Sequence, residues 1–449
     1  MAIHRFWDER HMTMEKKEIE KVQLEKLKKQ LRYEYDSSPY YRERIDAAKI
    51  VPETMGSLEE LQKIAVFTKE EHRKSQEESL KRFNHPYGLH VCKPMDQVVC
   101  VSATSGTTGI PTFYTFTKND ILTNNECTSR ALWWAGVRPG DTVLLAFALS
   151  MFVGGVPLAQ AIQHCGAKVL PVGAEGGTRR LLEFANLAKP THVIFTPSFA
   201  EYLNEKSQET IGKEIKALGI RTLICGGEAG AGDPAVRAKL EAAYGAEVYD
   251  WMGGAYGFMS ICCEHHQGMH HVSPDHTVLE LIDSETKEPL KMADGAVGNI
   301  AYTSLDWEAG PILRYDMGDV TQVFTSPCGC GMTGVRLKVI GRSDDMLIVK
   351  GINVYPMAVK NVVMDFFPRT TGEMRIVIDQ PGPKVPAPLH VKAEYGRGEK
   401  DLSKLKSDIE TKIHDVLRFK AEIELLPEGT MERTTTKAKL IEKHFEQKG

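Results

Sequence analysis

The pattern of hydrophobic and polar positions predicts an amphipathic helix near the start of the chain. Within residues 14–32, Ile19, Val22, Leu24, Leu27 and Leu31 stand among lysines and glutamates. Apolar residues that recur every three or four positions form a stripe along one helical face, which a soluble helix buries against its neighbours. We therefore expect this helix to pack on the body of a globular domain.

The middle of the chain alternates between short apolar runs and helical patterns. Runs rich in Val, Leu, Ile and Phe predict buried strands at 141–148, 167–172, 192–196 and 222–225. Helical or glycine-containing stretches, such as 158–164 and 179–188, separate them. This alternation is typical of an α/β fold with helices layered on a largely parallel sheet.

The most apolar stretch, residues 143–162, favours two elements over a membrane span. Polar and helix-breaking residues interrupt it at Ser150, at Gly154 and Gly155, at Pro157 and at Gln160. A membrane-spanning helix needs about 20 predominantly apolar residues. We therefore predict a buried strand, a glycine-rich turn and a helix, and no contact with a membrane.

The pattern changes beyond residue 341. A strand at 346–351 precedes a helix at 357–366, strands at 374–378 and 389–395, and a long amphipathic helix at 402–419. These elements suffice for a small α+β domain. The sequence thus predicts two domains, 1–341 and 342–449.

Composition and charge narrow the class of protein. At 449 residues the chain is longer than a domain with a single hydrophobic core usually is, so more than one domain is expected. The net charge of −4 gives no sign of the basic surface that binds nucleic acid. The nine cysteines are odd in number and irregular in spacing, which argues against a disulfide framework and for a reducing compartment. The first eight residues carry charges where a signal peptide needs an apolar core. We expect a cytoplasmic protein.

The composition of the loop at 101–112, rich in hydroxyl side chains and containing glycines, is suited to binding an anion. It follows the β-rich residues 97–100, and its glycines let successive N–H groups converge while Ser and Thr add donors. A plain turn is the alternative, and no Lys-Ser/Thr pair follows the last glycine as a Walker loop requires. The order Ser-Gly-Thr-Thr-Gly-x-Pro resembles the phosphate loop of adenylate-forming enzymes, which include acyl-CoA synthetases. By that resemblance the residues that bind ATP phosphates are Ser102, Thr104, Ser105, Gly106, Thr107, Thr108 and Gly109.

Three later motifs resemble the same superfamily, in the form typical of phenylacetate–CoA ligase-like proteins. The turn 226–230, Gly-Gly-Glu-Ala-Gly, follows a strand; it is either a plain strand-to-helix turn or, by resemblance, the place where Gly227 and Glu228 flank adenine. In 313–319, Leu-Arg-Tyr-Asp-Met-Gly-Asp, the resemblance assigns Asp319 to the ribose hydroxyls.

The segment 341–356 resembles the hinge of the superfamily. Its sixteen residues follow the family order, which a charged interdomain linker alone does not explain. The resemblance implies that Arg342 contacts ribose or phosphate and that Asp344 is the hinge. It also implies that Gly351, beside Lys350, lies where the thiol of coenzyme A enters.

A lysine near the C-terminus occupies the position of the family's catalytic lysine. In the family it reaches the carboxylate and the α-phosphate during adenylation, and Lys437 matches that position, with Lys439 as the neighbouring alternative. The segment departs from the family pattern, since Glu432 replaces Pro and Thr436 replaces Gly.

A second departure lies at 248–257, where the family pattern Tyr-Gly-x-Thr/Ser-Glu supplies a Glu that holds Mg²⁺. Tyr249 and Asp250 would belong to the nucleotide site, and Tyr256 would occupy the Glu position at the catalytic centre. The other alignment puts Ile261 there, and neither residue is a carboxylate. We expect Mg²⁺ to be held largely by phosphate and water, because it keeps much of its hydration shell.

Two clusters of soft metal ligands predict a structural zinc site. Residues 262–271 contain two cysteines and four histidines, and Cys328-Gly-Cys330 follows about sixty residues later. Buried thiols and a surface histidine turn are the alternative. The resemblance selects Cys263, His270, Cys328 and Cys330, with His265 as the other candidate nitrogen ligand.

The resemblance runs over nearly the whole chain and implies a large α/β domain that binds AMP and the acyl group, with a small α+β lid. It implies a ligase that joins a carboxylic acid, with an aryl or arylacetic acid favoured, to coenzyme A through acyl-AMP, releasing AMP and pyrophosphate. The expected cofactors are ATP, Mg²⁺, coenzyme A and a structural Zn²⁺, and the oligomeric state is open between monomer and homodimer. Two rivals remain: transfer to a carrier-protein thiol, an amine or a cofactor, and a catalytically silent nucleotide-binding protein. Aromatic and apolar residues that could wall an aryl pocket, or belong to the core, are Trp133, Trp134, Phe152, Trp251 and Met252.

Overall fold

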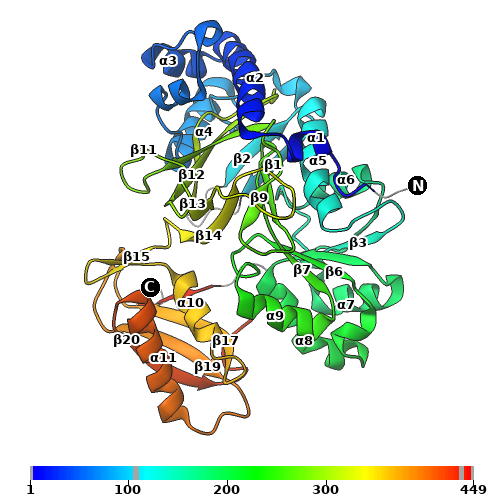
Figure 1. The fold of residues 1–449 in the computed structure, drawn as a ribbon, viewed down its shortest axis with the longest axis vertical. Helices are drawn as coiled ribbons and strands as arrows, with labels where there is room; N and C mark the ends of the chain where they lie inside the picture. The colour runs from blue at the N-terminus through cyan, green and yellow to red at the C-terminus, as the bar shows by residue number, and fades with distance from the viewer. Residues whose placement is uncertain (1–3, 105–110, 434–438, 446–449) are drawn as a thin grey trace.

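The computed structural model of the chain describes residues 4–104, 111–433 and 439–445. Figure 1 shows a large body, coloured blue to yellow, beside a smaller body in yellow, orange and red. The helices of the large body are α1 (Glu9–Met12), α2 (Lys16–Ser37), α3 (Pro39–Ala47), α4 (Lys69–Phe83), α5 (Lys118–Trp134), α6 (Val156–His164), α7 (Gly177–Ala188), α8 (Pro197–Ile211) and α9 (Pro234–Tyr244). The helix expected at 14–32 is α2, and those expected at 158–164 and 179–188 are α6 and α7.

The strands of the large body form a two-stranded hairpin and a twelve-stranded sheet. The sheet has the order β11-β10-β12-β13-β14-β9-β8-β7-β6-β5-β3-β4. The strands are β1 (Cys100–Thr104), β2 (Thr112–Phe116), β3 (Thr142–Leu145), β4 (Lys168–Pro171), β5 (His192–Phe195), β6 (Thr222–Gly226), β7 (Glu247–Gly253), β8 (Met259–Cys262), β9 (Met269–His271), β10 (Thr277–Ile282), β11 (Pro289–Leu290), β12 (Val297–Ser304), β13 (Tyr315–Phe324) and β14 (Arg336–Arg342).

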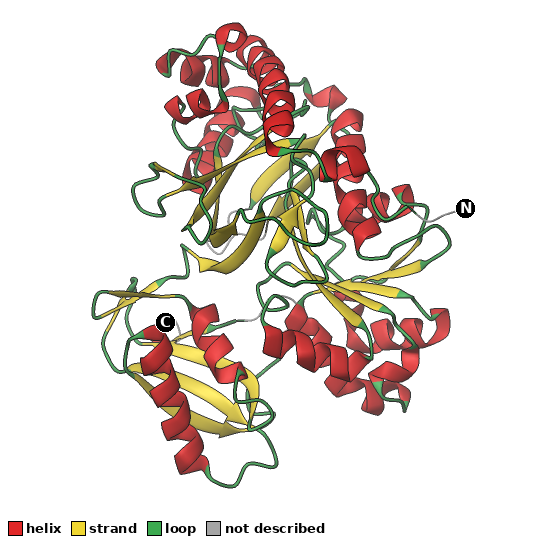
Figure 2. Cartoon of the chain, viewed as in Figure 1, coloured by secondary structure: helices red, strands yellow, loops and turns green. Residues whose placement is uncertain are grey.

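The parallel part of this sheet is covered by helices on both faces. Strands β4, β3, β5, β6 and β7 run parallel, which confirms the α/β pattern of the sequence. Alternate residues point to opposite faces. Thus Leu144 and Leu223 belong to the cluster packed under α7, α8 and α9, whereas Val143 and Ile224 belong to the cluster under α5 and α6. Figure 2 shows these helix and strand layers.

The other part of the sheet is antiparallel, so the expectation of a largely parallel sheet is only half right. From β7 through β8, β9, β14, β13, β12 and β10 to β11, each neighbouring pair is antiparallel. Parallel neighbours need a long crossover, usually a helix, whereas antiparallel ones can be joined by turns. The structure has no α-helix between residues 247 and 342, all of which it describes.

The small body is an α+β domain, as the sequence predicts. It holds a three-stranded sheet, β16-β15-β18, and a four-stranded sheet, β20-β19-β17-β21. Its core joins α11 residues such as Leu405 and Ile409 to Ile376 and Val391 of the sheet. The elements are β15 (Leu347–Val349), β16 (Ile352–Val354), α10 (Pro356–Met364), β17 (Thr370–Ile378), β18 (Lys384–Val385), β19 (Leu389–Tyr395), α11 (Leu402–Leu417), β20 (Ala421–Pro427) and β21 (Ile441–Lys443).

The apolar stretch 143–162 divides into β3, a connecting segment and α6, as expected. Within the described part of the chain, no helix combines the length and the apolar character needed to cross a bilayer.

Candidate active site

A cavity of about 480 Å³ lies where the parallel strands end. The residues that line it there follow or end these strands: Phe147 follows β3, Thr196 follows β5, Gly226 ends β6 and Gly227 follows it. Ligands of open α/β sheets bind beyond the carboxyl ends of the strands. The other walls include Lys69, Thr104, Tyr114, Asn124, Thr128, Phe152, Leu158, Trp251, Met259, Tyr315, Met317, Asp319 and Arg342.

The phosphate-loop candidates flank a segment that lies outside the described residues. Thr104 lines the cavity at the end of β1, and Ser102 is buried on the same strand. Ser105, Gly106, Thr107, Thr108 and Gly109 fall within 105–110, of which nothing is described. Helix α4 anchors the far side of the loop, since the Gln76 amide donates to the Pro111 carbonyl at 2.9 Å and accepts from the Phe113 N–H at 2.8 Å.

The glycine turn after β6 brings bare backbone to the cavity. A Cβ at Gly226 would lie 2.6 Å from the Trp251 carbonyl, so a side chain does not fit there. Gly227 has a φ of +81°, which glycine adopts without strain. The Glu228 carboxylate instead accepts from the Ser198 N–H at 2.8 Å and from the Ser198 hydroxyl, at the start of α8. It is half-buried and is not among the residues that line the cavity.

Asp319 and Arg342 form one charged unit on the cavity wall. They face each other across β13 and β14, with Arg342 Nη1 2.8 Å from Asp319 Oδ1. Arg342 Nε also donates to Asp344 Oδ1 at 2.8 Å. Burial acts to raise the pKa of Asp344, but the hydrogen bond and charge of Arg342 outweigh it and lower that pKa. Asp344, the predicted hinge residue, is therefore bound to Arg342, a predicted nucleotide-binding residue.

The predicted coenzyme A residues lie apart from this cavity. Lys350 and Gly351 form the exposed turn between β15 and β16, both with positive φ, and neither lines the cavity. Nothing lies within 4 Å of a Cβ built on Gly351. Lys437 falls within 434–438, outside the described residues, while Lys439 is described and exposed.

The structure places Tyr256 in the core, which corrects its assignment to the catalytic centre. The side chain is 0 % exposed, and its ring packs edge-on against Tyr114 at 5.3 Å and Trp307 at 5.5 Å. Its φ of +67° turns the ring away while the neighbouring Ala255 lines the cavity. Burial raises the pKa of the Tyr256 phenol, so the ring stays neutral.

Tyr249 and Asp250 are not brought to the cavity either. Tyr249 lines a separate, more open depression of about 930 Å³, together with His192, Thr222 and Glu247 at the amino ends of β5, β6 and β7. Burial raises the pKa of Asp250 to about 7, partly offset by the charge of Arg237. Their nucleotide-binding roles stay predictions that this arrangement does not support.

Of the suggested aromatic wall, Phe152 and Trp251 line the cavity, whereas Trp133, Trp134 and Met252 do not. Trp133 packs against Trp7, and Trp134 against Phe6. Sequence reasoning missed Lys69 and the α5 residues Asn124 and Thr128. The spacing of Asn124 and Thr128, four residues apart within a helical pattern, was the available signal.

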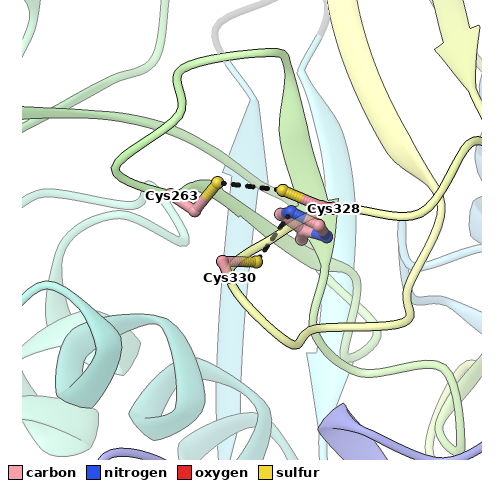
Figure 3. A group of neighbouring side chains, drawn as sticks. Cys263, Cys328 and Cys330 are labelled. Atoms are coloured by element: carbon pink, nitrogen blue, oxygen red, sulfur yellow. Dashed lines mark hydrogen bonds between the residues drawn. The ribbon is translucent and has the colours of Figure 1, made fainter.

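The cysteine and histidine clusters come together as one compact group. The ligand atoms of Cys263, His270, Cys328 and Cys330 all lie within 4.8 Å of one another. Figure 3 shows the three cysteines converging, with Cys263 Sγ 3.6 Å from Cys328 Sγ. Cys330 Sγ lies 3.3 Å from His270 Nε2. His265 is exposed and is not a member of the group.

Contacts around this group favour metal binding. His270 Nδ1 lies 3.1 Å from the Gly334 carbonyl, which orients Nε2 toward the sulfurs. Hydrogen bonds with Cys330 and His270 lower the pKa of the Cys263 thiol, although burial opposes this. Three thiols and one imidazole at this separation suit a tetrahedral zinc ion. None of the four residues lines the cavity, so the group lies apart from the candidate active site.

Comparison with known proteins adds independent information. Residues 36–304 match the family described as AMP-binding enzyme, and 351–444 match the AMP-binding enzyme C-terminal domain. The phenylacetate-coenzyme A ligase of Thermus thermophilus is 32% identical over 442 residues, covering 94% of this chain and 95% of the relative.

Two crystal structures of a 2-hydroxyisobutyryl-CoA ligase are similar over nearly the whole chain. The postadenylation state with 2-HIB-AMP has a TM-score of 0.89 at 29% identity and covers 100% of this chain and 94% of the other. The thioesterification state with 2-HIB-AMP and CoA scores 0.70 at 29% identity and covers 99% and 93%. Both are structures of one protein, and this chain superposes better on its postadenylation state than on its thioesterification state.

Proposed function

The chain belongs to the AMP-binding enzyme family, and on that premise we propose that it joins an aryl or arylacetic acid to coenzyme A through an acyl-AMP intermediate, at the expense of ATP. The observation that carries the proposal is the composition of the cavity. One wall holds Thr104, Asp319 and Arg342, whose motifs are those of nucleotide binding, and another holds an apolar, aromatic surface.

The reaction has two halves. The carboxylate oxygen of the acid attacks the α-phosphorus of ATP, which forms the acyl–phosphate bond and releases pyrophosphate. The coenzyme A sulfur then attacks the acyl carbonyl and AMP leaves, while the thiol proton passes to solvent. Both steps depend on positioning and on stabilising developing negative charge.

Each assigned residue has a distinct task in the first half. Asp319 accepts hydrogen bonds from the ribose hydroxyls, while Arg342, which pairs with Asp319, offers positive charge to the phosphate or ribose. Thr104 opens the loop that contacts the β- and γ-phosphates, and Lys437 approaches the α-phosphate. This division of labour follows the family motifs, and Thr104, Asp319 and Arg342 line the same cavity.

Magnesium would be held mainly by phosphate oxygens and water. Within the described part of the chain, Asp319 is the one carboxylate that lines the cavity, and it already pairs with Arg342. Mg²⁺ binds readily through substrate phosphates with few protein ligands.

The aromatic wall favours an aryl acid. Tyr114, Phe147, Phe152 and Trp251 line the cavity, and aromatic faces pack well against a planar ring.

The small body acts as a lid, with the domain boundary at 341/342. In support, β14 is the last strand of the large sheet in chain order and ends at Arg342, and the next strand, β15, begins at Leu347 and belongs to a separate sheet.

The experiment that tests this function is ATP–pyrophosphate exchange with a panel of carboxylic acids, followed by mass spectrometry of products formed with coenzyme A. Acid-dependent exchange and an acyl-CoA product are expected. Exchange without acyl-CoA would favour another acceptor, and no exchange with any acid would favour a silent nucleotide-binding protein.

A hydrogen bond and an ion pair between the lid and the large body should bias the balance of the two half-reactions. Lys239 on α9 lies 3.2 Å from Glu201 on α8 and donates to the Thr371 carbonyl of the lid at 2.9 Å. Arg433, which precedes the undescribed segment 434–438, lies 3.5 Å from Glu205 on α8. Both links require the lid position seen here.

We expect Lys239→Met to shift the balance away from adenylation by about two- to fivefold, because one partly buried hydrogen bond contributes about 1 kcal/mol. The measurement compares acyl-AMP formation with thiolysis of supplied acyl-AMP. Lys206→Met is the matched control, since Lys206 pairs with Glu209 on the surface of α8. An equal change in the ratio for both variants would contradict a role for Lys239 in lid placement.

We further propose that Cys263, His270, Cys328 and Cys330 hold a structural Zn²⁺ that ties the β8–β9 turn to the loop between β13 and β14. Cys330→Ser is expected to lose stoichiometric zinc and at least about 2 kcal/mol of stability, since metal binding contributes directly to folding. Metal analysis and thermal unfolding check both. His270→Ala should behave in the same way.

Two neighbouring residues supply the controls. Cys262→Ala replaces an equally buried cysteine outside the group, and His265→Ala replaces the alternative nitrogen ligand. Both variants should keep the metal. Wild-type protein without stoichiometric zinc, and with unchanged stability in chelator, would refute the site.

A further inference from the structure

One wall of the cavity has an unpaired polar patch. Asn124 and Thr128 line the cavity, are 3% and 2% exposed, and come from the same face of α5, four residues apart. Across residues 4–104, 111–433 and 439–445, neither side chain has a hydrogen-bond partner. A buried amide or hydroxyl left unpaired is unfavourable, so a ligand or water in the cavity must supply the partner.

Helix α5 is fixed firmly enough for this patch to select a ligand. Thr117 and Asp120 form a capping box at its start. The buried Asp120 carboxylate also accepts from the Glu308 N–H at 2.7 Å and the Ala309 N–H at 2.9 Å. These bonds hold the first turn to the loop before β13, so Asn124 and Thr128 have little freedom to turn elsewhere.

The surroundings of the patch are apolar. Helix α5 packs against α6 and β8, from which Leu158 and Met259 line the cavity, and both are 3% exposed. The charged residues that line the described part of the cavity are Lys69, Asp319 and Arg342, and they come from α4, β13 and β14. The patch thus offers an amide and a hydroxyl, without a charged group, within an otherwise apolar wall.

Resting on the proposed function, we infer that the acid substrate carries an uncharged hydroxyl group that Asn124 and Thr128 bind, and that it is a hydroxyaryl carboxylic acid. A phenol or alcohol can donate to Asn124 Oδ1 and accept from the Asn124 amide or the Thr128 hydroxyl. A second carboxylate or an ammonium group would be buried there without a counter-charge. The unsubstituted aryl acid would leave both side chains unpaired.

The test pairs each hydroxy acid with its parent in ATP–pyrophosphate exchange: the three hydroxyphenylacetates with phenylacetate, the three hydroxybenzoates with benzoate, and 2-hydroxyisobutyrate with isobutyrate. One hydroxyaryl isomer is expected to exceed its parent at least roughly tenfold in kcat/KM, since a site built around a hydroxyl rejects the analogue that lacks it. In the Asn124→Leu/Thr128→Val variant this ratio should fall toward one.

A matched control comes from the same helix. Ser129 is 0 % exposed and its hydroxyl also lacks a partner, but it does not line the cavity. Ser129→Ala should leave the ratio unchanged. If the double variant does not fold, Thr128→Val alone, which keeps the shape of the side chain, is expected to lower the ratio.

The outcomes separate this inference from the function on which it rests. Exchange with parent aryl acids, but with no preference for any hydroxy isomer, overturns the inference and keeps the ligase. A hydroxyl preference confined to the aliphatic pair, or an equal loss for both members of a pair in the variant, also overturns it. Exchange with no acid overturns the ligase and the inference together.

Discussion

We expect Lys437→Ala to abolish acid-dependent release of pyrophosphate while sparing thiolysis of supplied acyl-AMP. Removing one group that stabilises transition-state charge typically costs about 100-fold or more in rate. The chain enters this segment from a fixed point, because Arg433 Nη2 lies 2.8 Å from the fully buried Glu394. Lys437, four residues later, lies outside the described residues, so its approach to the α-phosphate stays a prediction.

The two half-reactions are measured separately, by pyrophosphate release and by acyl-CoA formation from synthetic acyl-AMP. Lys439→Ala is the matched control, since Lys439 is exposed and is the neighbouring candidate. An equal loss of both halves in Lys437→Ala would contradict the division of labour. A selective loss of adenylation in Lys439→Ala would transfer the role to Lys439.

The sequence was sufficient to predict the parts of the fold that repeat a simple pattern. Apolar runs such as 192–196 and 222–225 became β5 and β6 because both faces of a parallel strand are buried, which forces a continuous hydrophobic segment. The grouping of Cys263, His270, Cys328 and Cys330 was also anticipated, because two clusters of thiols and imidazoles indicated a site and the family resemblance selected these four residues. The geometry chose His270 over His265, since His265 is exposed outside the group.

Other features depend on tertiary placement that a local pattern does not encode. A tyrosine at a motif position says nothing of its direction, and Tyr256 turns inward at a φ of +67° to join Tyr114 and Trp307. Likewise, Asn124 and Thr128 look like ordinary polar helix residues until α6 and β8 close around them. In the antiparallel half of the sheet most paired strands are close in sequence, but the pair β9–β14 joins His270 to Arg336 across the intervening strands, and no local pattern predicts that pairing.

Asp319→Asn should lower kcat/KM for ATP at least about 100-fold, chiefly through a higher KM. A carboxylate that accepts two hydroxyl groups of ribose gains about 1.5–3 kcal/mol from each charged hydrogen bond, and every 1.4 kcal/mol is about tenfold in affinity. The amide keeps the shape of the side chain but loses the charge. Arg342 keeps its second partner, Asp344, so the wall of the cavity should persist.

The ribose contact itself can be isolated by changing the nucleotide. Wild-type enzyme should strongly prefer ATP to 2′,3′-dideoxy-ATP, and Asp319→Asn should discriminate little between them, because the carboxylate and the hydroxyls are partners in one interaction. If Asp319 served only to hold Arg342 at 2.8 Å, the variant would lose stability and slow both nucleotides alike. Undiminished discrimination in Asp319→Asn would therefore place the ribose elsewhere in the cavity, whereas its loss would tie the sequence motif at 313–319 to the sugar of ATP.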